Sequence, residues 1–147
     1  MKHLVAAFLV LTFFAGPLQV AQERAQVVNI FQLLVMPEKY ADKLVTVRGF
    51  LEIDIQPQHF GRAFLYVHQE DARNLLGNDI HVIPSEQMIK EEEKINRMYV
   101  LLTGVFKVRS VANAQVPETY IFVLEDVRNC TVWSNPDRPI GDSKNGG

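Results

Sequence analysis

The sequence predicts a mostly β domain, a small barrel of five strands with accessory helices, and three observations indicate it. Apolar and polar residues alternate over 44–55, as in a long strand with one buried face. The apolar stretch 98–108 has a glycine near its middle, as the first stretch does, and long strands that bend around a small barrel need such a break. A helical segment that begins at Ser85 separates three expected strands from two more.

Composition limits the class of protein. A chain of 147 residues and 16.8 kDa fits one domain, and 48% hydrophobic against 22% charged residues excludes a wholly disordered chain. The net charge of -2 gives no electrostatic basis for binding duplex nucleic acid or an anionic membrane surface. The single cysteine, Cys130, excludes an internal disulfide, and we expect it to be buried beside Trp133.

The first residues of the chain have the order of a secretory signal. A positive start is followed by an apolar run over 4–14 and then by the helix breakers Gly16 and Pro17. We expect a signal peptide over 1–21, cleaved after its last residue, and a protein exported to the periplasm or secreted. An uncleaved N-terminal segment is the alternative, and it is the only membrane contact we expect.

The first part of the mature chain combines a short helix with a long strand. Asn29 is suited to cap a helix over Ile30–Val35, which Pro37 ends. The face of the strand at 44–55 that should point inward comprises Val45, Val47, Gly49, Leu51, Ile53 and Ile55. The opposite face comprises Thr46, Arg48, Phe50, Glu52 and Asp54.

The remaining elements follow from the same patterns. Further strands are expected at 63–68, 79–83, 98–108 and 119–127. The connections should be a loop at 57–61, a turn or single helical turn at 69–78 and a polar loop at 109–118. The helix that starts at Ser85 has a narrow apolar stripe of Met88, Ile89, Ile95 and Tyr99. The barrel domain is thus expected over 22–133, with a flexible tail over 134–147.

The expected order is three strands, a helix and two strands, and the first strand is long and bent. This is the order of the oligonucleotide/oligosaccharide-binding (OB) barrel, a Greek-key design. The sequence also resembles a family of small exported bacterial proteins with this OB-like fold, in PEKYADKLVTVRGFLE (37–52), LYVHQEDARNLLGNDIHV (65–82) and YVLLTGVF (99–106). That family has no assigned activity, so the resemblance implies fold and export but no chemistry. Where it leads us to expect a loop with Gly and His, the chain has VANAQVPETY (111–120), and no family site is carried onto that loop.

Catalytic and metal-binding patterns are weak. Only His68 and His81 have a geometric reason to meet, whereas zinc or copper needs three or four donors, so we expect no metal and no cofactor. The chain has no G-x-S-x-G, and Cys130 has no histidine near it in sequence to activate it. We therefore expect a binding module rather than an enzyme. A hydrolase or other enzyme with dispersed residues remains the alternative.

The expected binding surface is the outside of strands one to three, the face that OB barrels use. It would comprise Arg48, Phe50, Phe64, Tyr66, His68 and His81. Aromatic rings beside cationic groups suit single-stranded nucleic acid, but the net negative charge disfavours it, so it stays a third alternative. We expect a partner protein, a peptide or a saccharide as ligand. The competing interpretation is that these aromatic side chains pack beneath the N-terminal helix or the loops.

Overall fold

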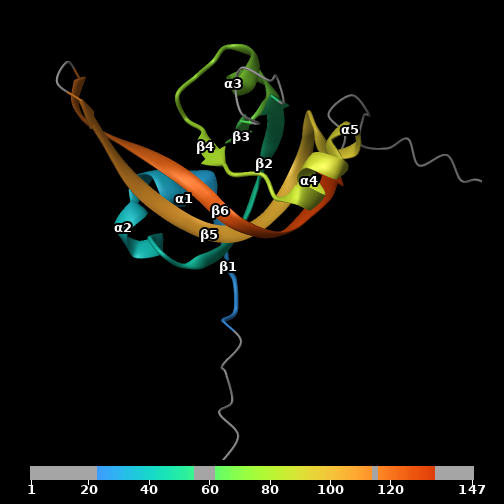
Figure 1. Ribbon diagram of the computed structural model, residues 1–147, viewed down its shortest axis with the longest axis horizontal. Coiled ribbons are helices and arrows are strands. Elements are labelled where there is room, and N and C mark those ends of the chain that lie inside the picture. The colour runs from blue at the N-terminus through green and yellow to red at the C-terminus, as the bar shows by residue number, and fades with distance from the viewer. Residues whose placement is uncertain (1–22, 55–61, 114–115, 135–147) are drawn as a thin grey trace, which may run out of the picture.

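The strands form one sheet that closes on itself. The computed structural model describes residues 23–54, 62–113 and 116–134, and within these ranges the sheet has six strands. They are β1 (Gln26–Asn29), β2 (Leu44–Asp54), β3 (Arg62–Tyr66), β4 (Ile80–Val82), β5 (Met98–Asn113) and β6 (Val116–Ser134). The strands β2, β3, β4, β6 and β5 pair in that order, and β5 pairs again with β2 (Figure 1). The predicted mostly β class and the closed barrel of five strands are confirmed.

The order of elements is that of an OB-like barrel. The β4–β6 pairing is parallel, and the other pairings within the barrel are antiparallel. The helices are α1 (Ile30–Val35), α2 (Pro37–Tyr40), α3 (Gln69–Arg73), α4 (Glu86–Lys90) and α5 (Glu92–Ile95). The last two lie between the third and fourth barrel strands, β4 and β5, where the sequence places a helix. Among the described residues no helix has both the length and the apolar character needed to cross a membrane.

Strand β1 was not predicted, and it changes the start of the barrel. It runs parallel to the first half of β2, and its last residue, Asn29, is opposite Arg48. From Phe50 onward β3 pairs with the same edge of β2, because β5 occupies the other edge. Gly49 lies where one partner strand replaces the other. Asn29 then caps α1 as predicted, since its side chain accepts a hydrogen bond from the Gln32 N–H at 2.8 Å.

The core fills the barrel and extends beneath the helices. The inward face predicted for β2 is confirmed, because Val45, Val47, Gly49, Leu51 and Ile53 are buried; Ile55 lies outside the described residues. Met88 of α4 and Ile95 of α5 are buried in the same core cluster as Leu33 of α1 and Tyr40 of α2. In Figure 1, α1 and α2 lie on one side of the barrel and α4 and α5 on the other.

The single helix predicted after Ser85 is wrong in its length. It breaks at Glu91 into α4 and α5. Tyr99 belongs to β5, and Ile89 is 45% exposed, so neither lies on the buried stripe.

The polar loop predicted at 109–118 is also wrong. Strand β5 continues to Asn113 and β6 begins at Val116, so the two strands form a long hairpin that projects from the barrel (Figure 1). Their backbones pair with each other, for example Arg109 with Ile121, and this pairing satisfies the peptide groups whatever the side chains. The signal peptide predicted at 1–21 and the loop predicted at 57–61 lie outside the described residues. So does the tail predicted at 134–147, except for its first residue, Ser134, which is the last residue of β6.

Candidate functional site

The six residues predicted to bind a ligand fall in three places. Phe50 and Tyr66 are only 1% and 6% exposed and pack with Ala72 of α3. Phe64 and His81 lie together in a groove, whereas Arg48 and His68 line a separate pocket. The structure therefore does not bring all six to one surface.

Phe50 and Tyr66 are buried and therefore belong to the core rather than to an exposed binding surface. The Phe50 ring meets the Tyr99 ring edge to face, with centroids 5.5 Å apart. Burial raises the pKa of the Tyr66 hydroxyl, and the carboxylates of Asp79 and Glu52 raise it further. Because α3 packs over these rings, little of either is accessible to a ligand. The competing interpretation named the N-terminal helix or the loops as the cover, and the covering residue Ala72 belongs to the helical turn in the connection at 69–78.

The groove lies on the outer faces of β3, β4 and β6. Phe64 is the register partner of His81, which is the partner of Val123, so the three side chains form a row across the strands. The Phe64 and His81 rings meet edge to face with centroids 4.8 Å apart. A cavity of about 430 Å³ opens over this row. Its apolar lining includes Phe64, Ile83, Ile89, Ile121 and Val123, and we refer to it as the β3–β4–β6 groove.

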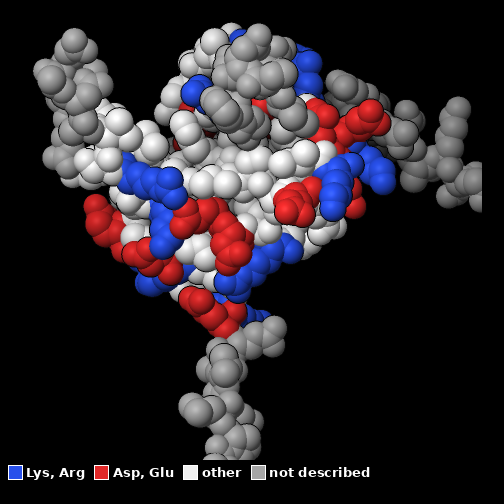
Figure 2. All heavy atoms as spheres, viewed as in Figure 1, with Lys and Arg blue, Asp and Glu red and all other residues white. Residues whose placement is uncertain are grey.

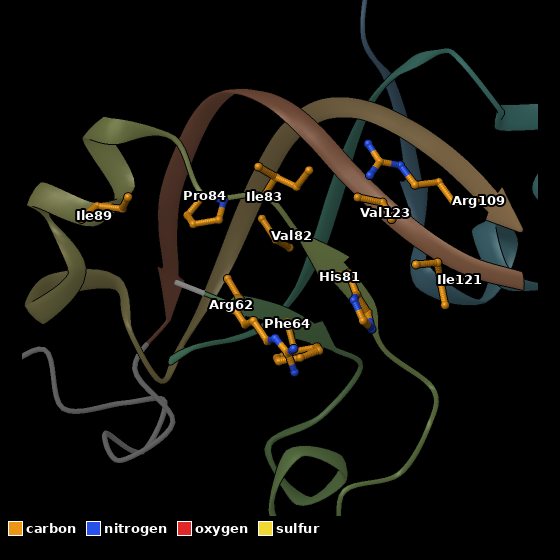
Figure 3. Close-up of a pocket in the computed structure, with 11 residues that line it drawn as sticks. Arg62, Phe64, His81, Val82, Ile83, Pro84, Ile89, Arg109, Ile121 and Val123 are labelled. Carbon is orange, nitrogen blue, oxygen red and sulfur yellow. The ribbon is translucent and has the colours of Figure 1, made fainter. Parts of the chain in front are cut away.

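Two arginines, Arg62 and Arg109, line this groove together with its apolar residues. Arg62 and Arg109 lie on opposite sides of His81 in Figure 3. Arg109 forms an ion pair with Glu125 across the hairpin, and Asp79 lies 3.6 Å from His81 Nε2. Figure 2 shows uncharged surface across the middle of the molecule with charged side chains gathered around it.

A lysine near the groove reinforces the same hairpin. The Lys107 Nζ atom lies 2.6 Å from Asp42 Oδ1 and 3.8 Å from Glu125 Oε1. The hydrogen bond to Asp42 is the main cause that raises the pKa of Lys107. Lys107 thus links Asp42, in the turn before β2, to Glu125 of the hairpin, and Glu125 is shared with Arg109.

The second pocket is built around the only tryptophan of the chain. The Arg48 guanidinium lies 5.5 Å from the centre of the Trp133 ring, and a cavity of about 240 Å³ beside them is also lined by Val67, His68 and Tyr99. We refer to it as the Trp133 pocket. The sequence analysis did not include Trp133 among the residues of the expected binding surface, and the structure places it in the same pocket as Arg48 and His68.

Cys130 is half-buried against the core, but not beside Trp133. It lies next to Met88 and Glu91 at the α4 side of the barrel, while Trp133 is 58% exposed. Burial raises the pKa of the Cys130 thiol to about 11, and the Glu91 carboxylate adds to this. A thiol that is protonated at neutral pH is a poor nucleophile, so its surroundings do not activate it.

Metal ligation finds no support in the described residues. Within 23–54, 62–113 and 116–134 no three His, Cys, Asp or Glu side chains are grouped closely enough to hold a metal ion. His68 and His81 lie in different pockets, so the pair that the sequence singled out does not converge.

Comparison with known proteins adds little. The sequence matches no protein-family model, and no curated protein matches it. Among solved structures the chain is similar to part of a protein described as an aspartyl-tRNA synthetase from Leishmania major Friedlin, with 11% sequence identity and a TM-score of 0.46. The similarity covers 83% of this chain and 23% of that protein, so the chain spans less than a quarter of its length.

Proposed function

We propose that this protein is an exported binding module that recognises a segment of a partner protein or peptide in the β3–β4–β6 groove. Export is supported by the N-terminal sequence alone, through the apolar run 4–14 and the breakers that follow. Binding at the groove is supported by its place in the fold, because OB barrels use the face of their second and third strands, here β3 and β4.

The lining of the groove favours a peptide with apolar side chains. Its floor comes from three neighbouring strands, and burying apolar ligand surface there contributes about 25 cal/mol for each Å². The cavity of about 430 Å³ falls within the range of ligand sites, about 300 to 1,000 Å³. Arg62 and Arg109, which also line the groove, supply N–H donors for backbone carbonyls or an acidic side chain of the peptide.

The same lining disfavours the other ligand classes. Phe64 and His81 pack against each other, which leaves fewer aromatic faces on which a base or sugar ring can stack. The charge of Arg109 is offset by Glu125, whereas binding to single-stranded nucleic acid depends on a continuous basic track. The observation that carries the proposal is therefore the apolar floor around the Phe64–His81 row.

A peptide selection tests this proposal. The immobilised domain would select from a displayed library of random peptides of about 12 residues, and the best peptide would be titrated against wild type, Phe64→Ala and Ile121→Ala. We expect each groove substitution to weaken binding about tenfold, the loss typical of removing one well-packed anchor. Val27→Ala is the matched control, because Val27 is an equally apolar side chain, 83% exposed on β1 and outside the groove.

Two results would contradict the proposal. One is a selection that enriches no peptide above background. The other is a selected peptide that binds both groove variants as tightly as wild type, since its site would then lie on another face.

A further inference from the structure

The Trp133 pocket lies apart from the β3–β4–β6 groove and has a different chemistry. Its walls combine an exposed indole, a guanidinium and an imidazole, contributed by Trp133, Arg48 and His68. Trp133 is the largest side chain of the protein and is 58% exposed, which costs hydrophobic stabilisation that burial would have given. An arrangement that keeps such a ring at the surface suggests a ligand.

A break in the β5–β6 ladder sets the position of Trp133. Tyr99 pairs with Ser134 and Val100 pairs with Val132, so Trp133 is the extra residue of a β-bulge and has no register partner on β5. Bulges of this kind redirect a side chain relative to the regular alternation of the strand. The indole is thereby placed over Arg48, which lies on β2 on the far side of β5.

The floor of the pocket is held by contacts of its own. The Tyr99 hydroxyl oxygen accepts a hydrogen bond from the Gln69 N–H at 3.2 Å, and the Tyr99 ring packs edge to face on buried Phe50. Val67 lies partly buried against the core beneath it. The pocket therefore lies over β2, β5 and β6 and the turn between β3 and α3, and its cavity of about 240 Å³ is smaller than the sites of drug-sized ligands.

These residues define the ligand chemistry. A guanidinium binds a carboxylate through two parallel N–H donors, and its cation–π contact with the indole does not use those donors. The His68 imidazole, which lines the same pocket, adds a further N–H donor. The part of the indole that Arg48 leaves exposed offers a flat surface for a ring.

We infer that the Trp133 pocket binds a small carboxylate whose ring stacks on Trp133 while Arg48 and His68 hold the carboxylate. The ring can belong to a sugar acid or to an aromatic acid, because both present a ring together with a carboxylate. This site is independent of the peptide groove, and neither proposal requires the other.

Trp133 fluorescence reports on this site directly, because the chain has one tryptophan. Full-length protein would be titrated with galacturonate and with phenylacetate, and separately with their neutral counterparts galactose and phenylacetamide. We expect at least one acid to change the Trp133 emission saturably and to bind about tenfold more tightly than its neutral counterpart. The acid that binds identifies which kind of ring the pocket takes.

Variants locate the binding. Arg48→Gln should weaken the acid about tenfold, while Arg128→Gln, which removes an exposed arginine of β6 outside the pocket, should leave it unchanged. Thermal unfolding of both variants checks that the fold is intact. The inference is overturned if neither acid binds, if the neutral compounds bind as tightly as the acids, or if folded Arg48→Gln binds like wild type.

Discussion

Gly49 lies against the backbone of Tyr66 so closely that a Cβ at Gly49 would stand 2.6 Å from the Tyr66 carbonyl oxygen. The same Cβ would stand 2.9 Å from the Ile30 side chain, at the start of α1. This is the point on β2 where β1 ends and β3 begins to pair. The glycine therefore permits a strand and a helix to approach β2 at one place, which a side chain would prevent.

Gly49→Ala should lower the free energy of unfolding by about 1 to 3 kcal/mol, the usual cost of overpacking a core, because a backbone carbonyl cannot move aside cheaply. Urea denaturation followed by circular dichroism measures it. Gly77→Ala is the control, because no atom lies within 4 Å of its Cβ position, and it should leave stability unchanged or slightly higher. Equal effects of the two substitutions would show that the contact at Gly49 is not tight.

Asn96 links the end of β2 to α5 through both atoms of its amide. Its Oδ1 accepts from the Ile53 N–H at 2.9 Å, and its Nδ2 donates to the Ile53 carbonyl at 3.1 Å and to Glu92 Oε1 at 2.7 Å. Asn96→Asp keeps the acceptor but places a carboxylate against two oxygens. We expect it to destabilise the protein by about 1 to 3 kcal/mol, measured by thermal and urea unfolding.

Asn74→Asp provides the comparison for Asn96. The Asn74 side chain donates one hydrogen bond to the Glu70 carbonyl at an exposed position. Losing this hydrogen bond should lower the free energy of unfolding by well under half of the loss expected for Asn96→Asp, because water can replace the missing partner at an exposed position. A similar loss of stability at both positions would mean that the two hydrogen bonds between Asn96 and the Ile53 backbone contribute no more than the exposed one.

The buried thiol gives a prediction about reactivity and pH. The pKa of Cys130 rises from its usual 9.0 to about 11, so its thiolate fraction at about pH 8 should be roughly a hundredfold below that of an unperturbed thiol. Reaction with a disulfide reagent should be correspondingly slow in the folded protein and fast in urea. Equal rates in the two states would contradict this environment.

The same shift sets a direction for stability. Between pH 9 and 11 the folded state keeps the Cys130 proton and the unfolded state releases it, so this group destabilises the fold as pH rises through that window. Cys130→Ser, measured over the same window, should show a shallower decline than wild type.

Leu75 occupies a backbone conformation that suits glycine. Its φ is 50°, it follows α3, and it is 82% exposed. The Leu76 N–H donates to the Asp71 carbonyl at 3.0 Å, which closes the helix end as glycine commonly does. Leu75→Gly should raise the free energy of unfolding by about 1 kcal/mol, because a side chain in this region is strained. Leu76→Gly should give no such gain, and a gain from both would point to lost exposed apolar surface instead.

The barrel was predictable because its signals are local. The alternation of apolar and polar residues along 44–54 predicts the buried face of β2 correctly. The spacing of Met88 and Ile95 likewise predicts helical structure that packs on the core. The signal for β1 was missing, since four residues next to a helix cap are too few to show a period. The hairpin beyond Arg109 was missed because pairing between two exposed strands does not require apolar side chains.

The candidate site was less predictable, because it depends on what covers each face. The alternation correctly puts Phe50 on the outer face of β2, but α3 then packs over it and over Tyr66. Phe64 and His81 are neighbours through the β3–β4 register, whereas the sequence had singled out His68 as the residue that meets His81. Trp133 could not be placed from sequence, because the bulge that aims it depends on the pairing of β5 with β6.

The measurement that tests the central claim most directly is mapping of amide chemical shifts on isotope-labelled protein as the selected peptide is added. The account predicts that the largest changes cluster at Phe64, His81 and Ile121, along β3, β4 and β6, while Arg48 and Trp133 stay unchanged. Saturable changes centred on any other face, with the groove residues unmoved, would contradict it.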